Sequence, residues 1–202
     1  MSQSISLHKK RILVTGGARG LGKAFASSLV EAGAKVAIAD ILVEEGNVAA
    51  KSMGAQFFEV DLTDPIEVTR CIEEVIKWLG GIDGLVNNAA IATGIGGPGM
   101  TDIEVKIWDQ VMDVNVRGTW LVSKASVPHL AKCGNGKILN LASDTALWGA
   151  TNLMHYVASK GAVVAMTRSM ANELGEKGIS VNCIAPGLTE VEATEYVPDE
   201  RK

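Results

Sequence analysis

Short apolar runs alternate along this chain with longer stretches of helical periodicity. Strands that alternate with helices form βαβ units, and right-handed crossovers between them build a parallel sheet covered on both faces. The sequence therefore predicts an α/β fold with a doubly wound parallel sheet, a Rossmann fold with helices on both faces, as a single domain over residues 1–202. The expected strands are residues 11–14, 35–39, 56–60, 84–87, 136–141 and 179–184.

Helix signals fill the stretches between these runs. Asp64 and Pro65 predict a helix start, since aspartate caps free N–H groups and proline fits the first helical turn. A longer helical stretch over 103–132 contains Gly118 and Pro128, and we expect both to interrupt it. The other expected helices span residues 23–32, 43–53, 65–79 and 156–175.

Composition excludes several function classes. The 202 residues carry a formal net charge of −4, which argues against a nucleic-acid partner because phosphate binding needs a basic face. No apolar run approaches the roughly 20 residues that span a bilayer, so we expect no membrane partner. The three histidines lack metal-ligand spacing, and no metal site is expected. Three cysteines without a CxxC pair are expected as reduced thiols of a cytoplasmic protein.

A glycine-rich stretch, TGGARGLG at residues 15–22, joins the first strand to the following helix. Glycines let the backbone turn tightly and approach a pyrophosphate, while the helix N-terminus offers free N–H groups. A strand–turn–helix context is the one that a dinucleotide site requires. The expected cofactor-binding residues of this turn are Gly16, Arg19, Gly20, Leu21 and Gly22.

Asp40 ends the second strand, 24 residues after Gly16. A carboxylate there can accept hydrogen bonds from ribose hydroxyls and repels a 2′-phosphate, which favours NAD over NADP as the cofactor. Arg19 is a counter-signal, since its guanidinium could pair with a 2′-phosphate. The alternative role for Asp40 is an ordinary helix N-cap.

The ends of the third and fourth strands also carry candidate cofactor contacts. The carboxylate of Asp61 suits an adenine amino group and Leu62 suits the ring face, with helix capping as the alternative for Asp61. A structural role is an equal alternative for Asn87, because a buried amide must find partners. Small residues after the fourth strand let the backbone pass close to a cofactor, at Asn88, Ala89 and Ala90.

Tyr156 and Lys160 lie four residues apart, so they share one face of the expected helix. A lysine ammonium beside a phenol favours the phenolate, and we expect the pKa of Tyr156 to fall. A tyrosine with a lowered pKa can exchange a proton with an alcohol oxygen near neutral pH. Ser143 lies thirteen residues upstream, at the end of the fifth strand. These residues predict the acid–base half of a carbonyl–alcohol redox reaction.

The order and spacing of these motifs resemble the short-chain dehydrogenase/reductase family over essentially the whole chain. The resemblance implies that Tyr156 is the general acid–base and that Lys160 lowers its pKa and holds the nicotinamide ribose. It further implies that Ser143 binds the substrate oxygen and that Asn115 bends a helix and holds a water in a proton relay. The segment of Pro186, Gly187 and Thr189 would bind the nicotinamide carboxamide.

The resemblance implies an oxidoreductase that transfers a hydride between NAD(H) and a small secondary alcohol, polyol or cyclic alcohol. The alternatives are an NADP-dependent ketone reductase of the same family and a non-catalytic nucleotide-binding relative. By position, Leu147 and Trp148 are expected to form an apolar wall of the substrate pocket. Asp144 and His155 are expected to face solvent, with contact to a polar group of the substrate as the alternative. Relatives pack the two long helices across a two-fold axis, so we expect a homodimer or homotetramer.

Two departures from the family pattern stand out. The usual Asn-Asn-Ala-Gly ends in Ala90 here, whose methyl group could tighten the approach of the cofactor. Relatives continue past the Pro186-Gly187 turn into two helices and a seventh strand, whereas this chain stops at Lys202. We therefore expect a truncated C-terminal end, an exposed sixth strand at the sheet edge, and an intact mass above 21.2 kDa.

Overall fold

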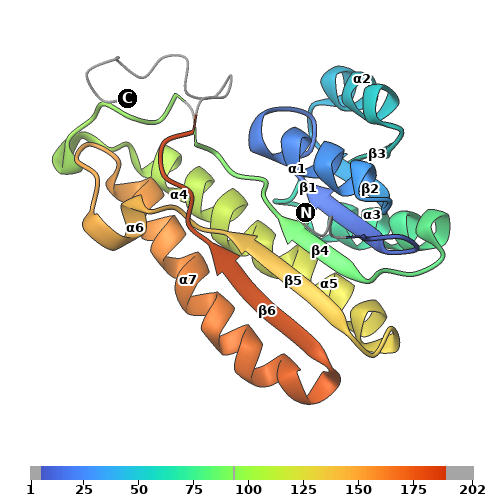
Figure 1. Ribbon diagram of the computed structural model, residues 1–202. Coiled ribbons are helices and arrows are strands. Elements are labelled where there is room, and N and C mark those ends of the chain that lie inside the picture. The colour runs from blue at the N-terminus through green and yellow to red at the C-terminus, as the bar shows by residue number, and fades with distance from the viewer. Residues whose placement is uncertain (1–5, 93, 190–202) are drawn as a thin grey trace, which may run out of the picture.

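The computed structural model describes residues 6–92 and 94–189, and its six strands form one parallel sheet (Figure 1). The strand order is β3-β2-β1-β4-β5-β6, so the direction of the winding reverses between β1 and β4. This order confirms the predicted doubly wound sheet and places β6 at one edge of the described sheet. The strands are β1 (Arg11–Thr15), β2 (Lys35–Asp40), β3 (Gln56–Glu59), β4 (Gly84–Asn87), β5 (Gly136–Leu141) and β6 (Ile179–Ile184).

Helices cover both faces of the sheet and enclose two apolar cores (Figure 1). Successive side chains of a strand point to opposite faces, so β1 contributes Leu13 to one core and Ile12 and Val14 to the other. The Leu13 core holds side chains of α3 (Pro65–Leu79), α5 (Thr119–Lys132) and α7 (Met154–Leu174). The Val14 core holds side chains of α1 (Gly20–Glu31) and α2 (Val43–Met53).

The stretch over 103–132 is divided into α4 (Val105–Met112), a π-helical segment (Asp113–Gly118) and α5. The interruption expected at Gly118 is confirmed, whereas Pro128 lies inside α5 and does not end it. The one-turn helix α6 (Thr145–Trp148) was not expected from the sequence, because four residues are too short for a helical period to show. Two 3₁₀ turns, Met100–Asp102 and Gly175–Lys177, complete the described elements.

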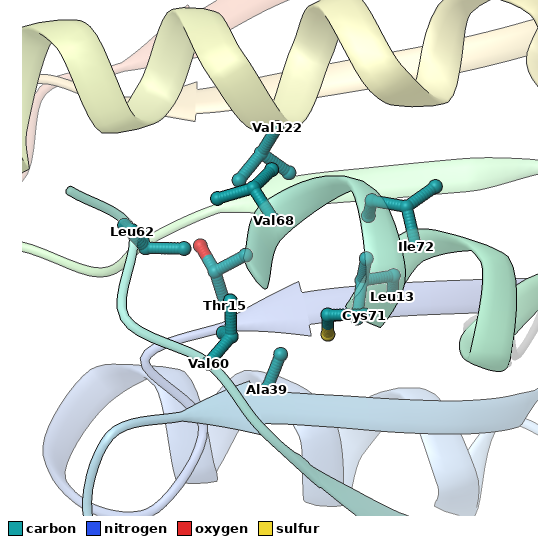
Figure 2. A pocket seen from close by; sticks show the side chains of 9 residues that line it. All are labelled: Leu13, Thr15, Ala39, Val60, Leu62, Val68, Cys71, Ile72 and Val122. Carbon is teal, nitrogen blue, oxygen red and sulfur yellow. The ribbon is translucent and has the colours of Figure 1, made fainter. Parts of the chain in front are cut away.

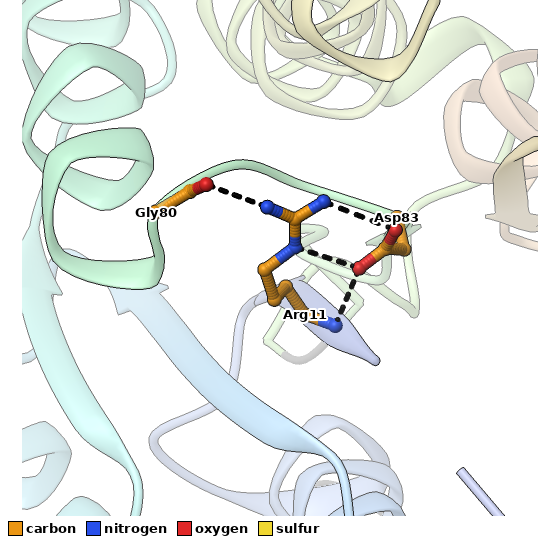
Figure 3. A network of polar contacts seen from close by, with 3 residues as sticks. All are labelled: Arg11, Gly80 and Asp83. Carbon is orange, nitrogen blue, oxygen red and sulfur yellow. Dashed lines mark hydrogen bonds and ion pairs between the residues drawn. The ribbon is translucent and has the colours of Figure 1, made fainter. Parts of the chain in front are cut away.

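An ion pair ties β1 to β4 at the amino ends of the strands (Figure 3). The Arg11 guanidinium donates to both carboxylate oxygens of Asp83, at 2.8 and 3.2 Å, and also to the carbonyl of Gly80. The backbone N–H of Arg11 donates to the same carboxylate at 2.9 Å. These bonds lower the pKa of Asp83 and fix the end of the sheet that lies opposite the strand ends described next.

Candidate active site

The carboxyl ends of the parallel strands bring most of the predicted site residues to one edge of the sheet (Figure 1). Thr15, Asp40 and Asn87 are the last residues of β1, β2 and β4, and Ser143 lies two residues past β5. Ligands of doubly wound sheets bind at this edge, where the strand order reverses. A ligand-binding site is therefore expected at this edge.

The glycine turn packs directly against the segment that follows β4. Gly16 has a φ of +67°, and a Cβ there would lie 2.6 Å from the Cα of Ala89. A Cβ on Gly22 would lie 2.0 Å from the carbonyl oxygen of Gly16 and 2.4 Å from Nδ2 of Asn88. The turn therefore has no room for side chains at these positions, and it leads straight into the N-terminus of α1.

Hydrogen bonds fasten this turn to the neighbouring strands. The Asp40 carboxylate accepts the N–H of Ala18 at 3.0 Å and that of Leu42 at 3.2 Å. Nδ2 of Asn88 donates to the carbonyls of Thr15 and Gly16 at 3.1 and 3.0 Å. A preformed turn at a helix N-terminus fits the pyrophosphate of a dinucleotide.

The residues after β3 lie partly in the core. The Asp61 carboxylate accepts the N–H and the hydroxyl of Thr63, both at 2.8 Å, which is a turn role. Leu62 is 9% exposed and lines an apolar cavity of about 10 Å³ (Figure 2). The cavity lies between the sheet and the helices α3 and α5, and Thr15 and Cys71 also line it. A cavity of that size holds at most one water, so it is a packing gap and not a ligand site.

Tyr156 and Lys160 lie on the first two turns of α7, beside the end of β5. The ammonium nitrogen of Lys160 lies 5.7 Å from the Tyr156 ring centroid and donates to the carbonyl of Leu141 at 2.7 Å. The Ser143 hydroxyl accepts hydrogen bonds from the N–H and the hydroxyl of Thr145, at 3.3 and 2.9 Å, and lies close enough to the Tyr156 phenol to act on its pKa. The predicted Ser143, Tyr156 and Lys160 set is thus brought together.

The expected fall in the pKa of Tyr156 is wrong for this structure. Burial raises the pKa of the phenol, and the hydrogen bond with Ser143 only partly offsets that rise. Burial also lowers the pKa of Lys160 to about 8, because its ammonium loses water on entering the interior. The lysine nitrogen donates to the Leu141 carbonyl, and burial is the largest influence on the pKa of both side chains.

Asn115 lies in the π-helical segment, 1% exposed, which confirms the expected irregularity of the helix there. Its side chain accepts the N–H of Ile91 at 2.7 Å and donates to the Ile91 carbonyl at 3.1 Å. It also donates to the hydroxyl of Ser159 at 3.0 Å. Asn115 therefore links the segment after β4 to α7, one turn beyond Tyr156.

The segment after β6 folds back towards Ser143. The Pro186 carbonyl accepts the N–H of Asp144 at 3.1 Å, and the Thr189 hydroxyl donates to the Gly187 carbonyl at 3.1 Å. The Cβ position of Gly187 lies 3.4 Å from the Asp144 carboxylate. Pro186, Gly187 and Thr189 therefore border the same site as Ser143.

Two expectations about the substrate side have different outcomes. Leu147 and Trp148 lie on α6, which begins two residues after Ser143, and they are 75% and 64% exposed. Their role as an apolar wall of the substrate pocket stays a prediction. His155 is fully buried, so the expectation that it faces solvent is wrong. The reason is helical periodicity, since His155 precedes the buried Ser159 and Val163 at steps of four residues.

The sequence reading missed three buried polar residues beneath the site, namely Ser123, Asn140 and Thr167. Asn87 donates to both Ser123 and Asn140, and Asn140 donates to Thr167. The sequence feature that could have identified them is a polar residue at an inward-facing position of an otherwise apolar strand or helix. The described residues hold no cluster of three or more metal-ligating side chains and no helix suited to crossing a membrane.

Comparisons with known proteins agree with this fold. The family described as "short chain dehydrogenase" matches residues 10–202. A 3-alpha-(or 20-beta)-hydroxysteroid dehydrogenase of Mycobacterium bovis is 38% identical over 95% of this chain and 73% of its own length. Galactitol 2-dehydrogenase of Agrobacterium fabrum is 38% identical over 95% of this chain and 75% of its own length.

Solved structures give the same answer. A 3-ketoacyl-(acyl-carrier-protein) reductase from Brucella melitensis, complexed with NADH, superposes with a TM-score of 0.90 at 31% identity. The match covers 93% of this chain and 79% of that protein. The family shown is one of oxidoreductases that act on alcohol or ketone substrates with a nicotinamide cofactor. This chain belongs to the short-chain dehydrogenase family.

Proposed function

We propose that this protein transfers a hydride between NAD(H) and a secondary alcohol or ketone, with Tyr156 as general acid–base. The observation that carries the proposal is the grouping of Tyr156, Ser143 and Lys160 at the strand ends that also carry the glycine turn. Asn115 completes the catalytic set by holding the segment after β4 against α7.

During alcohol oxidation, the Tyr156 phenolate oxygen accepts the proton of the substrate hydroxyl, and in ketone reduction the phenol returns it. The Ser143 hydroxyl holds the substrate oxygen and stabilises the charge that develops on it. The Lys160 ammonium lies beside the Tyr156 ring and is the proposed contact for the nicotinamide ribose of a bound cofactor. A bound nicotinamide supplies the hydride acceptor or donor.

NAD is the proposed cofactor because the half-buried Asp40 carboxylate lies at the end of β2, beside the glycine turn. That carboxylate would repel a 2′-phosphate. NADP use is the runner-up, since Arg19 is exposed at the start of α1. The other proposed cofactor contacts are Gly16, Arg19, Gly20, Leu21, Gly22, Asp61, Leu62, Asn88, Ala89, Ala90, Tyr156, Lys160, Pro186, Gly187 and Thr189.

An apolar, cyclic secondary alcohol is the proposed substrate class. Leu147 and Trp148 present exposed apolar side chains directly after Ser143, and such surface gains most from covering an apolar ring. The similar proteins act, by their names, on a hydroxysteroid in one case and on galactitol in another, so the comparisons leave both apolar and polyol substrates open.

A homodimer or homotetramer is the proposed assembly. An open groove of about 350 Å³ runs over the π-helical segment, α5 and α7, and Trp120 is 45% exposed within it. An open groove with a largely apolar lining suits burial against a second copy of the chain across a two-fold axis. We expect Trp120→Glu to shift the protein to monomers in light scattering coupled to size exclusion, and an unchanged mass would contradict this interface. The groove is lined by Met112, Asp113, Val116, Arg117, Trp120 and Met166.

The test of the proposed function is a panel of cyclic, acyclic and polyol alcohols, each assayed with NAD and NADP by the absorbance of the reduced cofactor. The proposal expects turnover with NAD and an apolar cyclic alcohol. Cofactor binding without turnover on any alcohol or ketone would instead favour a non-catalytic nucleotide-binding protein. Turnover with NADP alone would favour the reductase alternative.

A further inference from the structure

Four buried polar side chains form a continuous hydrogen-bonded network beneath the site. Nδ2 of Asn87 donates to Oδ1 of Asn140 and to the hydroxyl of Ser123, both at 2.9 Å. Nδ2 of Asn140 then donates to the hydroxyl of Thr167 at 2.9 Å. All four residues are at most 5% exposed, so these bonds do not compete with bulk water.

The direction of every bond in the network is fixed. The Ser123 hydroxyl donates its proton to the Thr119 carbonyl at 2.8 Å, and that of Thr167 donates to the Val163 carbonyl at 2.7 Å. Each hydroxyl oxygen can therefore only accept from the amides. The two amide groups are thus held in one orientation between two helices.

Each member of the network lies on an element that carries or directly adjoins a site residue. Asn87 precedes Asn88, and Asn140 lies three residues before Ser143. Ser123 continues a hydroxyl ladder on α5, in which the Thr119 hydroxyl donates to the carbonyl of Asn115 at 2.8 Å. The network therefore joins β4, β5 and α5 directly beneath the site.

The contact with α7 completes the connection to Tyr156. Thr167 lies eleven residues after Tyr156, which is about three helical turns and places both residues on one stripe of the helix. Lys160 lies between them on this stripe and bonds the Leu141 carbonyl, next to Asn140 on β5. Two side chains of α7 thus hold the helix to adjacent residues of one strand.

We propose that Asn87, Ser123, Asn140 and Thr167 are positioning residues that set the register of α7 against β5, and so the separation of the Tyr156 and Ser143 hydroxyls. This inference rests on the proposed function. Apolar side chains of similar size would fill the same space without desolvated polar groups. A polar network fixes direction and register as well as packing, and small displacements of reacting groups cost rate steeply.

The test is Thr167→Val, which keeps the side-chain shape and removes the oxygen that accepts from Asn140. We expect kcat to fall about tenfold to a hundredfold, since misplacement of this kind has effects of that size. The KM for the cofactor should stay within about twofold, because the glycine turn lies outside the network. Thr167→Ser restores the hydroxyl and should recover most of the lost kcat.

Two control variants separate positioning from ordinary loss of stability. Thr69→Val removes an exposed hydroxyl that donates to the carbonyl four residues earlier, as Thr167 does, and should leave kcat unchanged. Val75→Ala opens the core on α3, away from the network, and should lower the melting temperature while keeping kcat. If Thr167→Val does not fold, Ser123→Ala tests the same network by removing one of the two acceptors of Asn87.

Unchanged kcat in Thr167→Val or Ser123→Ala, at a melting temperature as low as that of Val75→Ala, would overturn the inference and leave the network a purely structural one. Failure of Thr167→Ser to recover kcat would also overturn it. Failure of the proposed function looks different, because the wild-type protein itself would then turn over no alcohol or ketone.

Discussion

The two halves of the site are built in different ways. Around the glycine turn, backbone atoms approach one another so closely that a Cβ on Gly22 would lie 2.0 Å from the Gly16 carbonyl oxygen. Around Tyr156, side chains hold one another, as when Lys160 bonds the Leu141 carbonyl and Asn115 bonds Ile91 and Ser159. The first half should therefore respond to added atoms, and the second half to the loss of polar atoms.

The difference has a physical basis. A pyrophosphate is recognised by backbone N–H groups and a helix dipole, which need space and no particular side chain. Proton transfer needs a titratable group at a defined distance, and only side chains provide one. Each prediction below perturbs one half and asks whether the other half is left intact.

The largest effect is expected for Tyr156→Phe, which removes the proposed acid–base oxygen and keeps the ring. We expect kcat to fall about a thousandfold or more, within the range that general acid–base catalysis contributes. Cofactor affinity, measured by fluorescence of the reduced nicotinamide, should be unchanged. A variant that retains most of its kcat would rule out Tyr156 as the proton carrier.

The second largest effect is expected on the free energy of unfolding, which should depend on pH because Lys160 is buried. Burial lowers its pKa from 10.5 to about 8, which at about 1.36 kcal/mol per pKa unit costs about 3 kcal/mol below pH 8. Between pH 8 and 10.5 the unfolded state binds more protons than the folded state, so stability rises with pH. Above 10.5 both states are neutral and the cost is gone.

Urea unfolding of the wild type and Lys160→Met from pH 7 to 10.5 measures this effect, because other titrating groups cancel in the difference. The wild type should gain up to about 3 kcal/mol relative to Lys160→Met across this range. Parallel stability curves for the two proteins would show that the Lys160 pKa is not lowered.

Gly22→Ala tests the cofactor half. The added Cβ meets the Gly16 carbonyl and the Asn88 amide, so the turn must shift, and we expect the KM for the cofactor to rise about a hundredfold. Gly46→Ala is the matched control, because its Cβ would lie 2.1 Å from the Phe57 ring, away from the site. Loss of stability with an unchanged KM is expected in the control, and a similar KM change in both variants would contradict the assignment.

The smallest effect is expected for Asp40→Asn, which removes the charge and keeps one oxygen, enough to accept from Ala18 while the Leu42 N–H loses its acceptor. Loss of repulsion towards a 2′-phosphate should raise kcat/KM for NADP about tenfold. The kcat/KM for NAD should fall only a few-fold. If the NADP to NAD ratio did not move, cofactor choice would lie elsewhere in the turn.

The sequence was sufficient for the features that local signals encode. Six strands, the glycine turn and the start of α3 at Asp64-Pro65 were predictable because residue type and periodicity act over a few neighbours. The raised pKa of Tyr156 was not predictable, since it depends on how much water the fold removes. The hydrogen bond between Asn140 and Thr167 was not predictable either, because it depends on which face of α7 packs on β5, and local sequence signals do not encode tertiary packing.

The most direct test of hydride transfer uses a secondary alcohol deuterated at its carbinol carbon, incubated with the protein and oxidised nicotinamide cofactor. Mass spectrometry of the reduced cofactor should show one added deuterium with the wild type and almost none with Tyr156→Phe. Reduced cofactor that carries no deuterium, or equal labelling by both proteins, would contradict the account.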